Sequence, residues 1–396
     1  MQGILSFTFV LVTFAVADLI AIKTKSIVSS MFTCSVIFIV GFWLGVPQTL
    51  FSDSTMHAIG AMLITSLLAH MGTMISLKEL KAQWKTVLIA TGAVIGIALI
   101  VLTVGPMLMG RNEALVAAPV ISGGVIAALK MQETMISTGV ANAESLAVFA
   151  TVLMVMEGFI GYPVASLMLR KEAKRIKSAL DNNTYVRPVN DEEENKRKKL
   201  IPQPKEDVDS DNFYLAKVAI VALLATLAAE GLKQLTGVNI IDKNIMSLLF
   251  GIVGHEIGFL DSGILAKANA NGLAMAALMA VVFSSLSYAT PEVLLEILPN
   301  IIIAQILGVI GYAVFSLIVG KLLNVSPWLS IAIGSTANYG FPGTYVISKE
   351  VSKAVGETQE EKEIILEAIL PKMLVGGFIT VSIASVFLAS IVAAFV

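Results

Sequence analysis

The same pattern of apolar segments occurs twice in this chain, about 213 residues apart, on either side of a charged stretch at 170–212. Each copy has five long apolar segments, and between its fourth and fifth lies an apolar stretch interrupted by small residues. The interruptions are 120–125 (Val-Ile-Ser-Gly-Gly-Val) and 334–344 (Gly-Ser-Thr-Ala-Asn-Tyr-Gly-Phe-Pro-Gly-Thr). Interrupted apolar segments at matching positions of two halves are typical of binding sites in secondary transporters.

Composition places the chain in a membrane. Hydrophobic residues make up 56% and charged residues 14% of the 396 positions, whereas soluble domains carry about 25% charged residues. Most apolar segments are long enough to cross a hydrocarbon layer of about 30 Å as helices. We therefore expect an all-α integral membrane protein with two repeats, each of five transmembrane helices and one re-entrant, broken-helix hairpin. The spans are expected near 3–21, 27–46, 55–77, 86–109, 144–169, 213–232, 239–260, 268–290, 298–320 and 368–394.

Basic residues predict the orientation, because short cytoplasmic loops collect Lys and Arg. An alternating assignment places most loop Lys and Arg residues on one side, which we expect to be the cytoplasm. Both termini are then extracytoplasmic and the central loop is cytoplasmic, as in a multi-pass protein of a bacterial inner membrane. Five spans is an odd number, so the second repeat is expected to be inverted relative to the first.

The charge pattern gives the expected organisation: an N-terminal membrane repeat at 1–169, a cytoplasmic linker at 170–212 and an inverted C-terminal repeat at 213–396. In the linker, the acidic run 191–194 lies beside the basic run 196–199. The two runs nearly cancel, which favours a solvated, flexible tether over a lipid-binding patch. Nucleic acid is not an expected partner; membrane lipid is.

The two halves also match weakly at single positions. Asp18 aligns with Glu230, and Ser122 aligns with Ser335. Asp18 and Glu230 lie toward the ends of their spans, which favours an interfacial position for both carboxylates. The two serines lie in the interrupted segments.

The interruptions predict a binding site for electrostatic reasons. Non-helical backbone at membrane depth must be buried in protein or line a wet cavity. The free N–H groups of a half-helix attract anions, and the free carbonyls at the other end can hold Na⁺. The candidate substrate-binding residues are Ser122, Gly123, Gly124, Gln132, Ser335, Thr336, Asn338, Gly340, Gly343 and Thr344. The alternative is that the small residues only permit close helix packing.

Glu157 is the strongest candidate for ion coupling, because it lies near the middle of an apolar span and intramembrane charge is costly. Glu133, Thr134 and Asn338 are further candidates. The alternative for Glu157 is a structural pairing with another buried polar group. We expect no catalytic residue, no cofactor and no metal site beyond one for a transported Na⁺.

The whole layout, with Ile121-Ser122-Gly123-Gly124 in the first hairpin and 338–344 in the second, resembles the bacterial sodium:glutamate symporter family. The resemblance implies sodium coupling, an elevator-like or rocking movement and a homodimer. Ile126 stands where the family pattern continues with another glycine, which leaves glutamate itself in question as the solute.

Other classes of protein have weaker support. The chain has no P-loop, no His-Glu-x-x-His and no Gly-x-Ser-x-Gly motif, so the sequence favours neither an ATP-driven pump nor an enzyme. A proton-coupled carrier or a cation:proton antiporter using Glu157 stays open, and so does an ion channel. The sequence favours Na⁺-coupled symport of a small anionic solute, a glutamate-like amino acid or a carboxylate.

Overall fold

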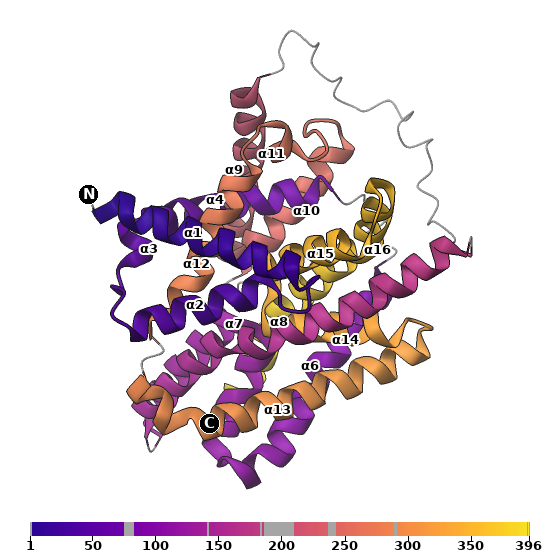
Figure 1. The fold of residues 1–396 in the computed structure, drawn as a ribbon. Coiled ribbons are helices and arrows are strands. Elements are labelled where there is room, and N and C mark those ends of the chain that lie inside the picture. The colour runs from indigo at the N-terminus through magenta and orange to yellow at the C-terminus, as the bar shows by residue number, and fades with distance from the viewer. Residues whose placement is uncertain are drawn as a thin grey trace. The chain divides into compact units, whose positions relative to one another are not determined.

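The computed structural model describes residues 2–74, 83–140, 142–182, 184–185, 210–236, 243–288, 291–393 and 395. These residues form helices and connecting turns, with no strand among them (Figure 1). Six of the described helices are long and apolar enough to cross a membrane, and three shorter helices are also apolar. The expected class of an all-α membrane protein is therefore supported.

The helices are bounded as follows. From the first half of the chain come α1 (Gln2–Lys23), α2 (Ser30–Trp43), α3 (Leu50–Asp53), α4 (Met56–Gly72), α6 (Trp84–Leu108), α7 (Arg111–Thr138) and α8 (Ala143–Asp181). From the second half come α9 (Asp211–Thr236), α10 (Lys243–Glu256), α11 (Ile264–Lys267), α12 (Asn271–Ser284), η3 (Ser285–Tyr288), α13 (Pro291–Leu322), α14 (Pro327–Ser335), η4 (Thr336–Asn338), α15 (Gly340–Val355), α16 (Gln359–Phe378), η5 (Ile379–Ala384) and α17 (Ser385–Ala393).

Each expected span overlaps a helix, although the lengths differ from those expected. Helices α2, α10 and α12 have 14 residues each, fewer than the roughly 20 that a straight crossing needs. Helix α8, at 39 residues, extends well beyond the expected end of its span at 169. The expected linker is thus partly helical, and its residues 186–209 lie outside the described residues.

The chain forms two compact units, and each unit takes helices from both halves of the sequence. Unit 1 consists of 1–10, 49–82 and 186–282, and unit 2 consists of 11–48, 83–185 and 283–396. Among the described helices, α4 joins α9 to α12 in unit 1. Helices α2 and α6 to α8 join α13 to α17 in unit 2. The compact units therefore do not coincide with the expected sequence repeats.

Glycines bring α4 close to its neighbours in unit 1. A methyl group at Gly60 would lie 2.2 Å from the carbonyl oxygen of Ala277 on α12, and one at Gly251 of α10 would lie 2.1 Å from that of Ala69 on α4. No side chain fits at such distances. This small-residue packing is typical of helices that associate in membranes.

A buried ion pair connects α9 to the segment after α10 in unit 1. The Lys217 Nζ lies 2.7 Å from a carboxylate oxygen of Asp261, and the two residues are 6% and 4% exposed. Lys267 lies 3.3 Å from the other oxygen. Burial alone would raise the pKa of Asp261, but the hydrogen bond and charge of Lys217, with the weaker contribution of Lys267, lower the pKa below its ordinary value.

Removing the negative charge of this pair should destabilise unit 1. Asp261→Asn leaves Lys217 buried without its counter-charge, so we expect a loss of about 3–5 kcal/mol in the free energy of unfolding. Lys267→Met is the matched control, because Lys267 is half exposed and should cost less than about 1 kcal/mol. Denaturant titration of the purified protein measures both, and equal effects of the two variants would contradict the assignment.

The same pair predicts a pH dependence of stability. Because the pKa of Asp261 is lower in the folded chain, its contribution is fully present above the ordinary aspartate value of about 3.9 and is lost as the pH falls through the folded value. Wild type should therefore lose stability on acidification below about pH 4, and Asp261→Asn should lose less over the same range. Parallel acid titrations of the two proteins measure the difference.

In unit 2, helices α6 and α13 correspond to the fourth expected span of each half. They approach each other closely at two glycines. A methyl group at Gly96 would lie 2.4 Å from the carbonyl oxygen of Gly311, and one at Gly311 would lie 2.6 Å from that of Gly96. The contact is thus reciprocal. Helix α8, magenta in Figure 1, packs along the yellow helices α15 and α16.

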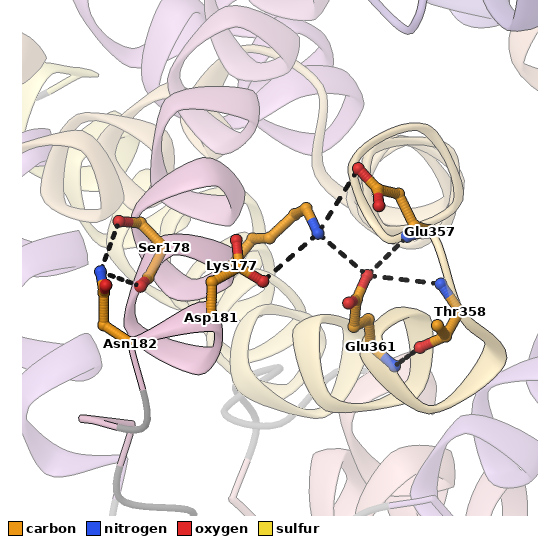
Figure 2. A network of polar contacts seen from close by, with 7 residues as sticks. All are labelled: Lys177, Ser178, Asp181, Asn182, Glu357, Thr358 and Glu361. Atoms are coloured by element: carbon orange, nitrogen blue, oxygen red, sulfur yellow. Dashed lines mark hydrogen bonds and ion pairs between the residues drawn. The ribbon is translucent and has the colours of Figure 1, made fainter.

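A polar network connects the end of α8 to the start of α16 in unit 2 (Figure 2). The Lys177 Nζ lies 3.5, 3.5 and 3.3 Å from carboxylate oxygens of Asp181, Glu357 and Glu361. Glu361 and Thr358 form a capping box, in which each side chain accepts a hydrogen bond from the other residue's backbone N–H. The network therefore fixes where α16 begins.

Candidate functional site

The helix break expected at 334–344 is present in unit 2. Helix α14 ends at Ser335, a short 3₁₀ turn follows, and α15 begins at Gly340. Gly340 has a φ of +52°, which favours glycine, and Phe341 has an extended ψ of 138°. The chain therefore has two half-helix ends facing one irregular segment, 336–341.

The break expected at 120–125 is absent, and that prediction was wrong. Helix α7 is continuous from Arg111 to Thr138 and includes Ser122, Gly123 and Gly124. The Ser122 hydroxyl donates to the carbonyl of Ala118 one turn earlier, so it is used within the helix. A methyl group at Gly123 would lie 1.7 Å from the Cβ of Ser385. The glycine thus permits close packing of α7 on α17, which was the alternative interpretation of the small residues.

Several helical segments of unit 2 surround the break at 336–341. A methyl group at Gly161 of α8 would lie 2.7 Å from the Cβ of Asn338, and one at Gly377 of α16 would lie 3.5 Å from the Cα of Gly340. Helix α7 also contacts the 3₁₀ turn, and η5 contacts it on a further side. The irregular backbone is therefore enclosed by protein, which is the condition under which such backbone is tolerated inside a bilayer.

Two buried amides meet beside the break. The Asn338 Nδ2 donates to the Gln305 Oε1 of α13 over 3.1 Å, and the residues are 2% and 1% exposed. The Asn338 Oδ1 and the Gln305 Nε2 have no hydrogen-bond partner among the described residues. Exchanging the oxygen and nitrogen positions in both side-chain amides gives the same result, with one oxygen and one NH₂ group lacking partners among the described residues. The pair thus presents one acceptor and one donor in either orientation.

Further buried polar atoms lie on the same elements. The Glu157 Oε1, the Tyr312 Oη and the Thr344 Oγ1 have no hydrogen-bond partner within the described part of the chain. Glu157 is 3% exposed and lies one turn before Gly161, on the face of α8 that packs on Asn338. A buried polar atom without a partner costs about 1–3 kcal/mol, and each such group calls for an explanation. A polar ligand bound at the break would supply one.

Two tyrosines lie beside the first turn of α15. The Tyr162 and Tyr339 ring centroids are 5.4 Å apart. A methyl group at Gly343 would lie 3.1 Å from Tyr162 Cε1 and 2.7 Å from Tyr339 Cδ2. Both rings thus pack against Gly343, which leaves no room for a larger residue there.

The segment after α16 is also irregular where it contacts the break. η5 is a π-helix, and its Thr380 hydroxyl lies 3.2 Å from that of Thr336. π-helical turns within α-helices are frequent at functional sites. The break and η5 thus place two non-α segments side by side.

Several expected site residues use their polar atoms locally. The hydroxyls of Ser335, Thr336 and Thr134 donate to carbonyls in their own helical segments. The Gln132 Nε2 donates to Thr151 on α8. The side chain of Glu133 lies outside the described residues. Of the expected residues, Asn338, Gly340, Gly343, Thr344 and Glu157 therefore carry the site.

Three residues of this region were not expected from the sequence: Gln305, Tyr162 and Tyr312. Gln305 carried a detectable signal, because it is an isolated polar residue in the apolar run 298–320. The tyrosines carried none, since aromatic residues in apolar spans usually belong to the packed interior.

Two comparisons of the sequence with known proteins find no match. No family model matches this sequence, and no curated protein sequence matches it. The resemblance to sodium:glutamate symporters therefore rests on the arrangement of segments and on the two short motifs.

The close contact at Gly161 predicts a measurable clash. Gly161→Ala should destabilise unit 2 by about 1–3 kcal/mol, because the added methyl overlaps Asn338. Gly231→Ala in α9 is the matched control, since nothing lies within 4 Å of a methyl group there and alanine favours a helix by up to about 1 kcal/mol. Thermal unfolding should shift down for the first variant and not for the second; a gain in both would contradict this packing.

Proposed function

We propose that this protein is a secondary active transporter that carries a small anionic solute, an amino acid or a carboxylate, together with Na⁺. The observation that carries the proposal is the helix break at 336–341, enclosed by helices that carry buried polar atoms with no hydrogen-bond partner among the described residues. Broken helices of this kind form solute and ion sites in transporters.

The chemistry of the break supports one anionic and one cationic ligand. The first N–H groups of α15 and the amide NH₂ beside Asn338 are donors suited to a carboxylate. The oxygens of Glu157, Thr344 and the amide pair, with the last carbonyls of α14, are ligands that a hard cation prefers. The anionic solute would then bind at the N-terminal end of α15, and Na⁺ would bind at the C-terminal end of α14.

The division into units supports alternating access. Each compact unit draws helices from both halves of the chain, and the fourth helices of the halves meet reciprocally at Gly96 and Gly311. We infer an inverted repeat of five spans per half, in which the second half carries the broken hairpin. The cytoplasmic linker, the extracytoplasmic termini, the bacterial inner membrane and the homodimer belong to this same proposal.

Proton coupling is the second candidate, and Glu157 favours it. This carboxyl is 3% exposed and has an oxygen without a partner among the described residues. A buried carboxyl that alternates between a neutral and a charged form is a usual proton carrier in transporters.

Ligand-dependent stability tests the class of function. We expect one amino acid or carboxylate to raise the melting temperature of the purified protein in Na⁺ but not in K⁺, since a ligand of the folded state stabilises it by mass action. A shift that is independent of Na⁺ but varies with pH would favour proton coupling. No shift across the panel would contradict a carboxylate site.

Two substitutions test the site itself. Asn338→Ala should raise the half-saturating solute concentration about tenfold, which corresponds to one lost hydrogen bond of roughly 1.4 kcal/mol. Glu157→Gln should remove the dependence of uptake on the coupling ion. Ser348→Ala, which removes a hydroxyl bonded within α15, is the control and should leave uptake unchanged. Normal uptake kinetics in Asn338→Ala would place the solute elsewhere.

A further inference from the structure

The arm of the broken hairpin is attached to the start of another helix through one carboxylate. Glu350 of α15 accepts hydrogen bonds from the backbone N–H of Ser30, over 3.2 and 3.3 Å to its two oxygens, and from the Ser30 hydroxyl. Ser30 is the first residue of α2 and is fully buried. Glu350 therefore binds the N-terminus of α2, where the free N–H groups favour a negative charge. All these residues belong to unit 2.

A second carboxylate shares the same serine. The Ser30 side chain also interacts with Asp18 of α1. A serine hydroxyl has one proton, so it donates to one carboxylate at a time. The other carboxylate can hydrogen-bond the serine oxygen only by bringing a proton of its own. The group of Asp18, Ser30 and Glu350 is therefore best satisfied when the two carboxylates together hold one proton.

Burial brings the titration of Glu350 into the neutral range. Burial raises the pKa of Glu350, the hydrogen bonds from Ser30 lower it, Asp18 raises it and Lys353 lowers it, with a net pKa of about 7. Glu350 lies outside the six candidate spans. The Cys34 thiol of α2 also interacts with Asp18 and Glu350. Helices α8 and α16 pack on α15 too, and no ionisable group described on them is among those acting on Glu350.

We propose that Glu350, with Asp18 and Ser30, forms a proton-controlled latch that docks the hairpin arm α15 on the N-terminus of α2. One bound proton keeps the latch closed, and its loss releases the arm. The latch is independent of which solute the protein carries.

The direction of the effect follows from linkage. Docking buries Glu350 beside Asp18, so the docked state binds a proton more tightly than a released state in which Glu350 faces water, where its pKa is about 4.3. Raising the pH between these two values therefore favours release, by up to tenfold in the population ratio per pH unit. Asp18→Asn removes the like charge that raises the pKa of docked Glu350, so the release should be smaller and should stop growing at a lower pH.

Distance measurements between spin labels test the latch directly. Cys34 is the single cysteine of the chain, so labels can be placed at Val40→Cys on α2 and Ala354→Cys on α15 in a Cys34→Ser background. Val40 is 40% exposed and Ala354 is partly exposed. We expect mainly the short distance at pH 5.5, and a second, longer distance whose population grows as the pH rises toward about 7 and then levels off.

Charge variants decide between a latch and a fixed contact. Glu350→Gln keeps an acceptor for Ser30 but cannot ionise, so it should stay docked from pH 5.5 to 8.5. Glu363→Gln, at an exposed carboxylate on α16, should behave as the parent. Distances that do not change with pH in the parent, or that change equally in Glu350→Gln, would overturn the proposal. The labels report on α15 without any solute, so this outcome is separate from that of the transport experiments.

Discussion

The irregular backbone at 336–341 sets the main physical constraint on unit 2. Peptide groups without helical partners cannot face lipid, so other helices must cover them closely. Gly161 of α8 allows this approach, because a methyl group there would overlap Asn338, and a methyl group at Gly377 of α16 would just touch Gly340. Asn338 then finds Gln305 of α13 as a partner. The helices of unit 2 are thus arranged around one short segment that could not be stable by itself.

Polar side chains in this region divide into two groups. The hydroxyls of Ser122, Ser335 and Thr336 are satisfied within their own helices, so they add little to a binding site. The partnerless atoms of Glu157, Asn338 and Thr344 are different, because nothing described in the structure offsets the cost of burying them. This division, rather than residue type, separates structural polar groups from candidate ligands. It moves the proposed site toward α8, α13 and the break, and away from the glycine pair of α7.

Helix α15 connects the proposed solute site to the latch. Its first turn borders the break, and Glu350 lies ten residues later, roughly 15 Å along a rigid helix. A ligand at the break and a proton at Glu350 would therefore both bias the position of the same element. Two sites that bias one two-state element are coupled, and the coupling is reciprocal. Proton coupling could then arise at Glu350 as well as at Glu157.

The order of the residues was enough to predict an all-α membrane protein and the approximate positions of its helices. Apolar runs of span length favour membrane helices, and each expected span overlaps a helix. It also located the break at 334–344, because Gly340, Pro342 and Gly343 follow one another within four residues. The adjacent glycines Gly123 and Gly124 of α7 do not break that helix. A helix tolerates each glycine at a cost of only about 1 kcal/mol.

Contacts between residues far apart in the chain could not be predicted from the sequence. The pairing of Asn338 with Gln305, and of Glu350 with Ser30, joins positions that no local pattern relates. The two compact units were also hidden, because helices from both halves pack together in each. Helix formation depends on neighbours along the chain, whereas hydrogen-bond partners and close contacts depend on how helices pack in three dimensions.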